Sequence, residues 1–139
     1  MEISGDIPLV FPVHPRTRVA LTRAGLSSRM EKAANLHMLD PLGYLPFLSL
    51  MSQARVIVTD SGGLQEESTV LGIPCLTLRA NTERPITVEM GTSTLIGSDA
   101  KKLRNCLRDV LSGSYKSGSC PDLWDGHAAE RIAELLVNG

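Results

Sequence analysis

The sequence predicts an α/β fold in which a parallel sheet of about five strands carries helices on both faces. Short apolar runs rich in β-branched residues alternate with segments of helical periodicity along the whole chain, which is typical of strand–helix–strand crossovers. The first run, residues 7–13, is apolar on both faces, as expected of a parallel strand covered on both sides. A length of 139 residues suffices for one domain with a hydrophobic core, and no internal repeat or inter-domain linker divides it.

Five of the apolar segments are expected to be strands because they are short and rich in β-branched residues. They cover residues 7–13, 35–39, 55–58, 75–78 and 93–96. Pro8 and Pro12 fit the ends or an edge of the first strand better than a central position, because proline cannot donate to a ladder.

Six helices are expected from periodicity and from proline and glycine signals. They cover residues 15–24, 44–53, 64–71, 85–90, 98 or 99 to 112, and a last segment that begins at 125 or 126. Pro15 and Pro85 suit a first helical turn, and Gly25, Gly91 and Gly113 suit a helix end.

The last two helices are each expected to bury one apolar stripe. In the helix that ends at 112, the stripe consists of Leu103, Cys106, Leu107, Val110 and Leu111. In the final helix, the residues expected to face inward are Ala129, Ile132, Ala133 and Leu136.

Composition excludes several classes of function. The formal net charge is −1 and the aromatic side chains are few (Trp 1, Tyr 2, Phe 2), so neither nucleic acid nor a membrane surface is indicated as a partner. No apolar run is long enough to span a membrane, and residues 1–6 do not resemble a signal peptide. Cys75, Cys106 and Cys120 are odd in number and widely spaced, which argues against a disulfide framework and a structural zinc site and favours a reducing cytoplasm. No cofactor is indicated.

The most informative stretch is the turn Ser61-Gly62-Gly63, where a strand gives way to a helix. A helix N-terminus offers free N–H groups and a partial positive charge, and glycine lets a ligand approach the backbone closely. The turn therefore predicts a phosphate site, and the alternative is a plain strand-to-helix turn with acidic capping. Glu66 and Glu67 would repel a phosphate, so at least one of them should point elsewhere, for instance at sugar hydroxyls.

Three other side chains lie near the carboxyl ends of strands, where ligands of open α/β sheets bind. Arg84 follows the fourth strand, and its planar guanidinium matches a diphosphate; the alternative is a surface ion pair with Glu83 or Glu89. His14 follows the first strand and either faces the ligand edge or serves as a capping or packing residue. Phe47 lies near a helix start and belongs either to the core or to a base pocket.

A set of motifs occurs in a characteristic order along the chain. They are Phe11-Pro12-Val13-His14-Pro15, Tyr44-Leu45-Pro46-Phe47, Thr59-Asp60-Ser61-Gly62-Gly63-Leu64-Gln65-Glu66-Glu67, Thr82-Glu83-Arg84-Pro85, Gly91-Thr92 and Leu123-Trp124-Asp125-Gly126. Together they resemble the C-terminal half of the non-hydrolysing UDP-N-acetylglucosamine 2-epimerases of bacteria and archaea, over essentially the whole chain.

The resemblance implies that residues 1–139 form a UDP-binding, Rossmann-like domain, a truncated C-terminal domain of the two-domain GT-B fold. In that family the active site lies in the cleft between the two domains. The implied activity is that of an isomerase that interconverts UDP-GlcNAc and UDP-ManNAc. The C2 proton is removed and UDP is expelled, which leaves a glycal, and UDP then adds back with C2 inverted.

The resemblance also implies a phosphate site. Ser61 and the amides of Gly62 and Gly63 would bind the phosphates, and Arg84 would contact the diphosphate. Because UDP leaves as an anion, these dipoles and this charge would stabilise the transition state. Keeping UDP bound between its departure and its return would hold the reacting groups in place.

The remaining roles follow from the same resemblance. Glu67 would accept hydrogen bonds from the ribose hydroxyls, which leaves Glu66 to solvent or to packing. Phe47 would lie beside the uracil. His14 would lie near the cleft, where some bacterial members of the family bind a second, regulatory UDP-GlcNAc.

Two parts of the family pattern are absent from this sequence. They are the N-terminal domain with its catalytic carboxylates, and a His-Arg-Arg-Glu motif on the first strand–helix unit of the C-terminal domain. We therefore expect no catalytic residue in this chain, and no epimerisation by it alone. In the Rossmann order 3-2-1-4-5-6 the missing strand is central. The strand at 7–13 should then pair directly with the strand at 55–58, or a second copy or a separate N-terminal domain should supply a neighbour.

Two other functions compatible with the motifs are the donor-binding domain of a GT-B glycosyltransferase and a non-catalytic UDP-binding fragment. The glycosyltransferases share the Gly-Gly and glutamate pattern, whereas the Thr82–Pro85 segment favours the epimerase. The missing half favours the non-catalytic fragment.

Overall fold

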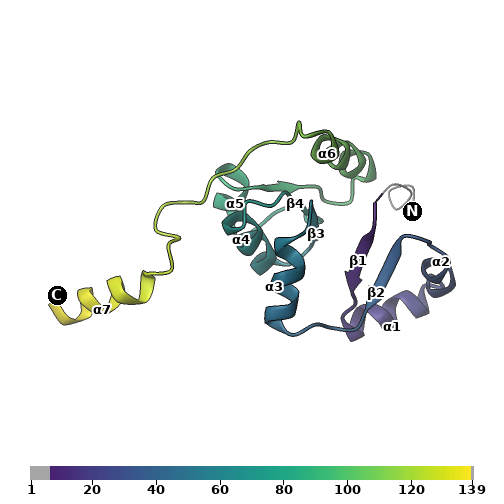
Figure 1. The fold of residues 1–139 in the computed structure, drawn as a ribbon, viewed down its shortest axis with the longest axis horizontal. Helices are drawn as coiled ribbons and strands as arrows, with labels where there is room; N and C mark the ends of the chain where they lie inside the picture. The colour runs from purple at the N-terminus through teal and green to yellow at the C-terminus, as the bar shows by residue number, and fades with distance from the viewer. Residues whose placement is uncertain (1–6, 139) are drawn as a thin grey trace. The chain divides into compact units, whose positions relative to one another are not determined.

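A computed structural model describes residues 7–138, and in it strands and helices alternate as expected of an α/β protein (Figure 1). The strands are β1 (Leu9–Pro12), β2 (Leu36–Leu39), β3 (Ile57–Thr59), β4 (Cys75–Thr77) and β5 (Ser93–Leu95). The helices are α1 (Pro15–Arg23), α2 (Ser27–Glu31), α3 (Tyr44–Ser52), α4 (Gly62–Val70), α5 (Pro85–Glu89), α6 (Ala100–Ser112) and α7 (Ala128–Asn138). Every expected strand and helix is present, and most are shorter than expected.

The expectation of one five-stranded sheet is wrong, because the five strands form two separate parallel sheets. In the first, β1 pairs with β2, with Leu9 opposite Leu36. In the second, β4 lies between β3 and β5. The expected direct pairing of β1 with β3 is likewise absent. Within each sheet the neighbours are those expected from the Rossmann order, with β1 beside β2 and with β4 between β3 and β5.

The chain falls into two compact units, Met1–Leu50 and Met51–Gly139. In the first unit, α1 begins at Pro15 and ends before Gly25, whose φ of +67° suits the residue after a helix. The short helix α2 was not predicted, because its N-cap residue, Leu26, provides no side-chain cap and no other start signal precedes it. Val13 is the only fully buried residue among residues 7–50.

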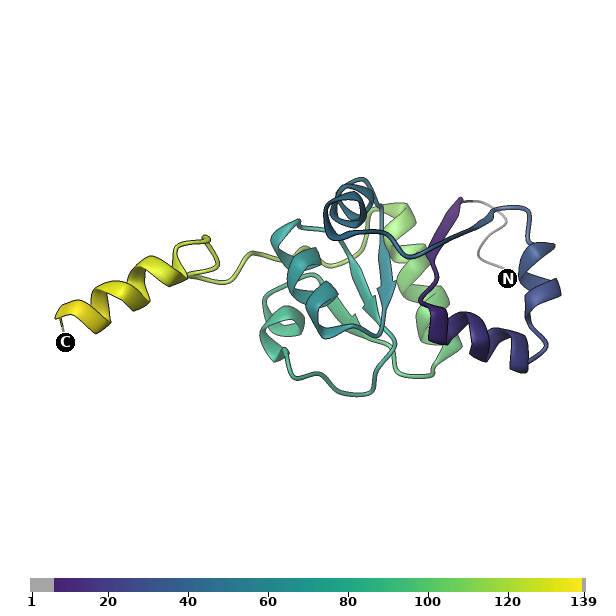
Figure 2. The ribbon, with the colours of Figure 1, turned by 90° about the horizontal axis from the view of Figure 1, so that it is seen from below.

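The second unit holds most of the core. Figure 2 shows α4 and α5 on one side of the β3-β4-β5 sheet and α6 on the other. Its buried apolar residues are Met51, Ile57, Ile73, Cys75, Leu76, Ile96, Leu107 and Val110. The central strand β4 is buried over all three residues, as expected of a parallel strand covered on both faces. The stripe predicted for α6 is confirmed: Leu107 and Val110 are buried and the other three members are partly buried.

A close backbone crossing fixes the segment that follows α6. A Cβ added to Gly118 would lie 2.5 Å from the Gly91 carbonyl carbon, and one added to Gly91 would lie 2.5 Å from Thr69 Oγ1. Ser119 N donates to Met90 O at 2.8 Å at the same place. Gly91 is therefore required by its packing against Thr69 of α4 and Thr87 of α5 rather than by its φ, and Gly118 is required by its packing against the Gly91 backbone.

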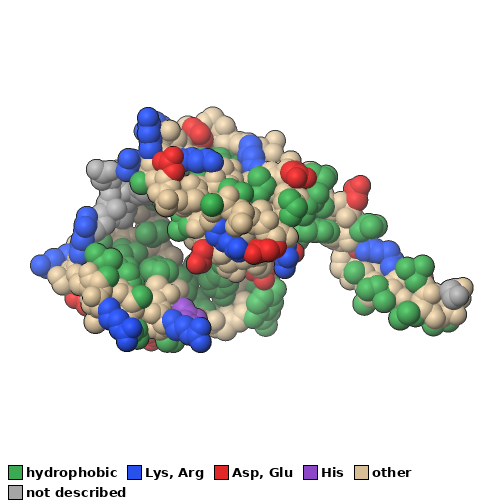
Figure 3. Space-filling view, turned by 180° about the vertical axis from the view of Figure 1, so that it is seen from behind, with side chains coloured by type: hydrophobic (Ala, Val, Ile, Leu, Met, Phe, Trp, Pro, Cys, Tyr) green, Lys and Arg blue, Asp and Glu red, His purple; other side chains and the backbone are tan. Residues whose placement is uncertain are grey.

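The apolar face of α7 is not buried, contrary to expectation. Ile132 and Leu136, expected inside, are 58% and 80% exposed. Figure 3 shows the corresponding apolar side chains gathered on α7. The start of the helix is instead fixed by polar contacts, with Asp125 accepting from the His127 amide and from the Arg131 guanidinium. These two donors, Arg131 foremost, lower the pKa of Asp125 to about 2. Among the described residues, no helix is long and apolar enough to cross a membrane.

Candidate functional site

Ser61, Gly62 and Gly63 form the junction between β3 and α4. Ser61 is the N-cap residue, with extended backbone angles, and its side chain makes no capping hydrogen bond. Its backbone N–H donates to Thr59 Oγ1 at 3.0 Å, which fixes the turn. The helix, expected to begin at Leu64, begins at Gly62. The amides of both glycines therefore lie in the first turn, where a helix offers them no internal acceptor.

The space in front of these glycines is open. Neither has a positive φ, so the backbone conformation does not require glycine at either position. A Cβ at Gly62 would meet no heavy atom within 4 Å, and one at Gly63 would meet only Ser61 Oγ, at 4.0 Å. The amides are thus accessible to a ligand at the positive end of the α4 dipole, an arrangement that suits an anion.

The two adjacent glutamates on α4 have different surroundings. Arg84 Nε donates to Glu66 Oε1 at 2.7 Å, and the two side chains are 44% and 39% exposed. Arg84 therefore pairs with Glu66 rather than with Glu83 or Glu89. Glu66, which was expected to face solvent or to pack, is instead in an ion pair. The partly buried Glu67 carboxylate makes no hydrogen bond or ion pair with the described residues. The arrangement neutralises one carboxylate and leaves the other available to a ligand.

Glu83 has its own partner in the loop before α5. Arg79 donates to both of its carboxylate oxygens, at 2.9 and 2.7 Å. This hydrogen-bonded contact is the main cause that lowers the pKa of Glu83 and raises that of Arg79. The pair is largely solvent-exposed and contributes little to stability.

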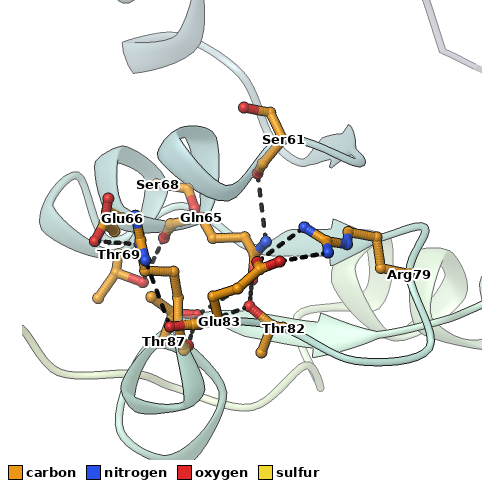
Figure 4. Close-up of polar contacts among 10 residues, drawn as sticks. Ser61, Gln65, Glu66, Ser68, Thr69, Arg79, Thr82, Glu83 and Thr87 are labelled. Atoms are coloured by element: carbon orange, nitrogen blue, oxygen red, sulfur yellow. Dashed lines mark hydrogen bonds and ion pairs between the residues drawn. The ribbon is translucent and has the colours of Figure 1, made fainter.

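One residue of this region was missed from the sequence. Gln65 on α4 is fully buried, and its carboxamide reaches the loop that carries Arg84 (Figure 4). Gln65, Ser68 and Thr69 have the spacing of one helix face. Polar residues at that spacing do not predict burial, because a helix packed on a sheet usually buries apolar residues there. All three are buried, so this face of α4 is polar and internal.

The other two predicted site residues, His14 and Phe47, belong to the first unit. His14 Nδ1 accepts from the Arg16 amide at 3.3 Å and caps α1, so the capping alternative is confirmed. Because Nδ1 accepts, the proton of the neutral ring lies on Nε2. Phe47 is partly buried near the start of α3. The assignments of Phe47 to a uracil contact and of His14 to a regulatory cleft stay predictions.

Comparison with known proteins identifies close relatives along nearly the whole chain. The family profile described as UDP-N-acetylglucosamine 2-epimerase matches residues 1–137. A UDP-N-acetylglucosamine 2-epimerase of Methanococcus maripaludis is 44% identical over 128 residues, which are 92% of this chain and 34% of that protein. That of Escherichia coli K12 is 39% identical over 137 residues, 96% of this chain and 36% of that protein.

Solved structures give the same result. The UDP-GlcNAc 2-epimerase of Methanocaldococcus jannaschii in complex with UDP-GlcNAc and UDP superposes with a TM-score of 0.84 at 38% identity, covering 99% of this chain and 38% of that one. The enzyme of Neisseria meningitidis bound to UDP-GlcNAc gives a TM-score of 0.73 at 31% identity, covering 95% and 36%. The chain thus spans little more than a third of the length of the relatives it matches.

Proposed function

Since this chain belongs to the UDP-N-acetylglucosamine 2-epimerase family, we propose that its second unit binds the UDP moiety of a UDP-sugar. The phosphates lie against the N-terminus of α4, where they accept from the amides of Gly62 and Gly63 and from the Ser61 hydroxyl. Arg84, whose Nε is bonded to Glu66, donates to the diphosphate from its terminal guanidinium nitrogens. The neighbouring M. jannaschii structure, which was solved with UDP-GlcNAc and UDP, supports this choice of ligand.

The proposal rests mainly on the different surroundings of the two glutamates, Glu66 and Glu67. Arg84 neutralises Glu66, and Glu67 keeps an unengaged carboxylate one residue further along α4. A carboxylate with free lone pairs is suited to the adjacent hydroxyls of a ribose, to which it can accept two hydrogen bonds. The site therefore suits a nucleotide better than inorganic phosphate, because the nucleotide brings ribose hydroxyls for Glu67 as well as phosphates for the turn.

Titration of UDP into the chain tests the proposal. We expect saturable 1:1 binding by isothermal titration calorimetry, and a loss of roughly tenfold to a hundredfold in affinity for Glu67→Ala, because each charge-assisted hydrogen bond is worth about 1.5–3 kcal/mol. Glu89→Ala, which removes an exposed glutamate of α5, is the matched control and should bind as the wild type does. Equal affinities of Glu67→Ala and wild type would contradict the role of Glu67, and absence of binding in the wild type would contradict the site.

The proposed role in the family reaction is to hold the leaving group. In that reaction a base takes the C2 proton, the C1–O bond to UDP breaks, and its electron pair leaves with UDP. The amides of α4 and the Arg84 guanidinium stabilise the charge that grows on the diphosphate. They also retain UDP until it adds back to the glycal. No residue of this chain is assigned the proton transfer, so we propose that the catalytic groups belong to the part of the family's proteins that these 139 residues do not match.

This gives a second experiment, which separates a UDP-binding part of an epimerase from a non-catalytic UDP-binding protein. The pure chain should form no UDP-ManNAc from UDP-GlcNAc when followed by NMR. Mixing it with the separately produced N-terminal portion of the M. maripaludis relative should restore turnover if the chain is an epimerase part. UDP binding without restored turnover would favour the non-catalytic alternative.

Phe47 and His14 carry two further proposals, which rest on the family resemblance. Phe47 would contact the uracil, since a partly buried aromatic ring can stack on a base. His14, whose Nε2 proton the capping bond does not use, would contact a second, regulatory UDP-GlcNAc. A Phe47→Ala variant should weaken binding of uridine as well as of UDP.

A further inference from the structure

Gln65 is a buried polar side chain that the proposed UDP contacts do not use. It is fully inaccessible to solvent although it lies in the second turn of α4, next to the open glycine turn. Its Oε1 lies 2.9 Å from Thr82 Oγ1 and 3.5 Å from Thr87 Oγ1, and its Nε2 lies 3.4 Å from the Ser61 carbonyl oxygen (Figure 4). One carboxamide therefore links the turn at Ser61 to the loop at Thr82, and the Thr87 hydroxyl lies near its oxygen.

Donor and acceptor chemistry fixes the direction of each bond. Nε2 faces the Ser61 carbonyl, to which only a nitrogen can donate, so the oxygen of the carboxamide must face the two hydroxyls. Thr87 Oγ1 donates to the Arg84 carbonyl at 2.7 Å, which is much the shorter of its two contacts. Thr82 Oγ1 accepts from the Arg84 amide at 3.0 Å, and its own proton is therefore available for Gln65.

The result is a continuous relay of hydrogen bonds. It runs from the Ser61 carbonyl through Gln65 and the Thr82 hydroxyl to the Arg84 amide, and Thr87 holds the Arg84 carbonyl from the other side. Both backbone polar groups of Arg84 are thus held by threonine hydroxyls, one of which is itself fixed by Gln65. A buried, satisfied network of this kind restricts the geometry of every member.

We propose that Gln65 is a positioning residue that sets the separation between the glycine turn of α4 and Arg84. The inference rests on the proposed function, in which those two elements contact the same diphosphate. Because a diphosphate has a fixed length, a shift of one element relative to the other would break one set of contacts. Gln65 does not touch the ligand in this account and acts only through Ser61, Thr82 and Arg84.

The test uses near-isosteric variants of the full chain. Gln65→Met keeps the volume and removes both hydrogen-bonding groups, and Thr82→Val removes the hydroxyl that links Gln65 to Arg84. Gln53→Met, a change of the other glutamine of the chain on a solvent-exposed site, is the control. Circular dichroism and thermal unfolding establish that each variant is folded before ligands are added.

We expect Gln65→Met and Thr82→Val each to weaken UDP binding by about tenfold, with a smaller effect on UMP, which lacks the second phosphate. The double variant should be little worse than either single variant, because both break the same relay. Gln53→Met should bind both nucleotides as the wild type does. An equal loss for UDP and UMP, additive losses, or unchanged UDP binding would overturn the proposal. If Gln65→Met does not fold, Thr82→Val in the surface loop gives the same UDP-to-UMP comparison.

A measurement without ligand separates this inference from the proposed function. In the free chain, amide hydrogen exchange at Arg84 should be about tenfold faster in Gln65→Met than in the wild type, because Thr82 then loses the bond that holds it. Gln53→Met should leave that rate unchanged. If the wild type does not bind UDP, the proposed function fails, and the Arg84 exchange rate alone decides whether Gln65 positions the loop. An unchanged rate would overturn the relay.

Discussion

At the scale of single residues, Gly62 has a specific combination of properties, a helical backbone angle and open space where a side chain would be. Gly62→Ala should therefore raise the free energy of unfolding by up to about 1 kcal/mol, since alanine suits a helix better than glycine. The same methyl group would occupy the place of the ligand and should weaken UDP binding by about tenfold or more. Urea unfolding and calorimetric titration of one preparation measure both effects.

A reciprocal change provides the control for Gly62→Ala. Ala100 is the first residue of α6, as Gly62 is of α4. Ala100→Gly should lower the free energy of unfolding by a similar amount and leave UDP affinity unchanged. A destabilised Gly62→Ala variant would contradict the helical conformation of Gly62. A variant that binds UDP normally would show that the space in front of α4 is not the ligand site.

The local part of this site could be predicted from the sequence, and the long-range part could not. The glycine turn was identified from its place between an apolar strand and a helix, which is a property of neighbouring residues. The partner of Glu66 depends on where the loop after β4 returns, and the periodicity of α4 says nothing about that. The role of Gln65 depends in addition on burial, which is unusual for a glutamine.

At the scale of elements, Tyr115 ties the segment after α6 to β5. Its hydroxyl donates to the Thr92 carbonyl at 3.0 Å and therefore accepts from Thr94 Oγ1 at 2.6 Å. Burial, which disfavours the phenolate, raises the pKa of Tyr115 to about 12. The ordinary value in an unfolded chain is about 10.

This difference predicts how stability changes at alkaline pH. Between about pH 10 and 12 the unfolded chain loses the Tyr115 proton while the folded chain retains it, so the stability that Tyr115 contributes falls as pH rises through this window. Urea unfolding between pH 9 and about pH 11 should show a steeper decline for the wild type than for Tyr115→Phe, which has no proton to lose. Parallel declines would contradict the assignment.

The elements differ in how well the sequence specified them. Proline and glycine signals located α1, α5 and α6 closely. The short helix α2 has neither a side-chain cap nor an apolar stripe, so no local signal distinguished it from a loop. The apolar stripe of α7 was identified correctly as a helix, but periodicity cannot tell whether a partner surface covers the stripe, and in this structure the stripe is exposed.

At the scale of the whole molecule, the two sheets should differ in stability. Among the described strands, only β4 has neighbours on both sides, and it is fully buried. The β1-β2 pair consists of two short strands, a size that is marginally stable in water, and Val13 alone is fully buried in residues 7–50. Amide exchange should therefore be slowest in β4 and much faster in β1 and β2. Equal protection of the two sheets would contradict this prediction.

The division into two sheets illustrates what a motif-based argument can reach. The sequence pattern predicted parallel strands in the correct order along the chain. The number of sheets depends on which strands pair with one another. Pairing is set by backbone geometry, which the motifs do not specify. The expectation that five strands would close into one sheet failed for that reason.

The crossing of Gly118 over Gly91 has a consequence for how this sequence can vary. A Cβ on Gly118 would meet backbone atoms of Gly91 and Thr92, so no change of side chain at those two positions can make room for it. In a saturation library of residues 113–121 selected for folding, Gly118 should tolerate no other amino acid, whereas its exposed neighbours Ser117 and Ser119 should accept many. The helix α5, which begins next to Arg84, ends at this crossing. The polar loop at residues 113–121 therefore contains one position, Gly118, that cannot be changed without disturbing the fold.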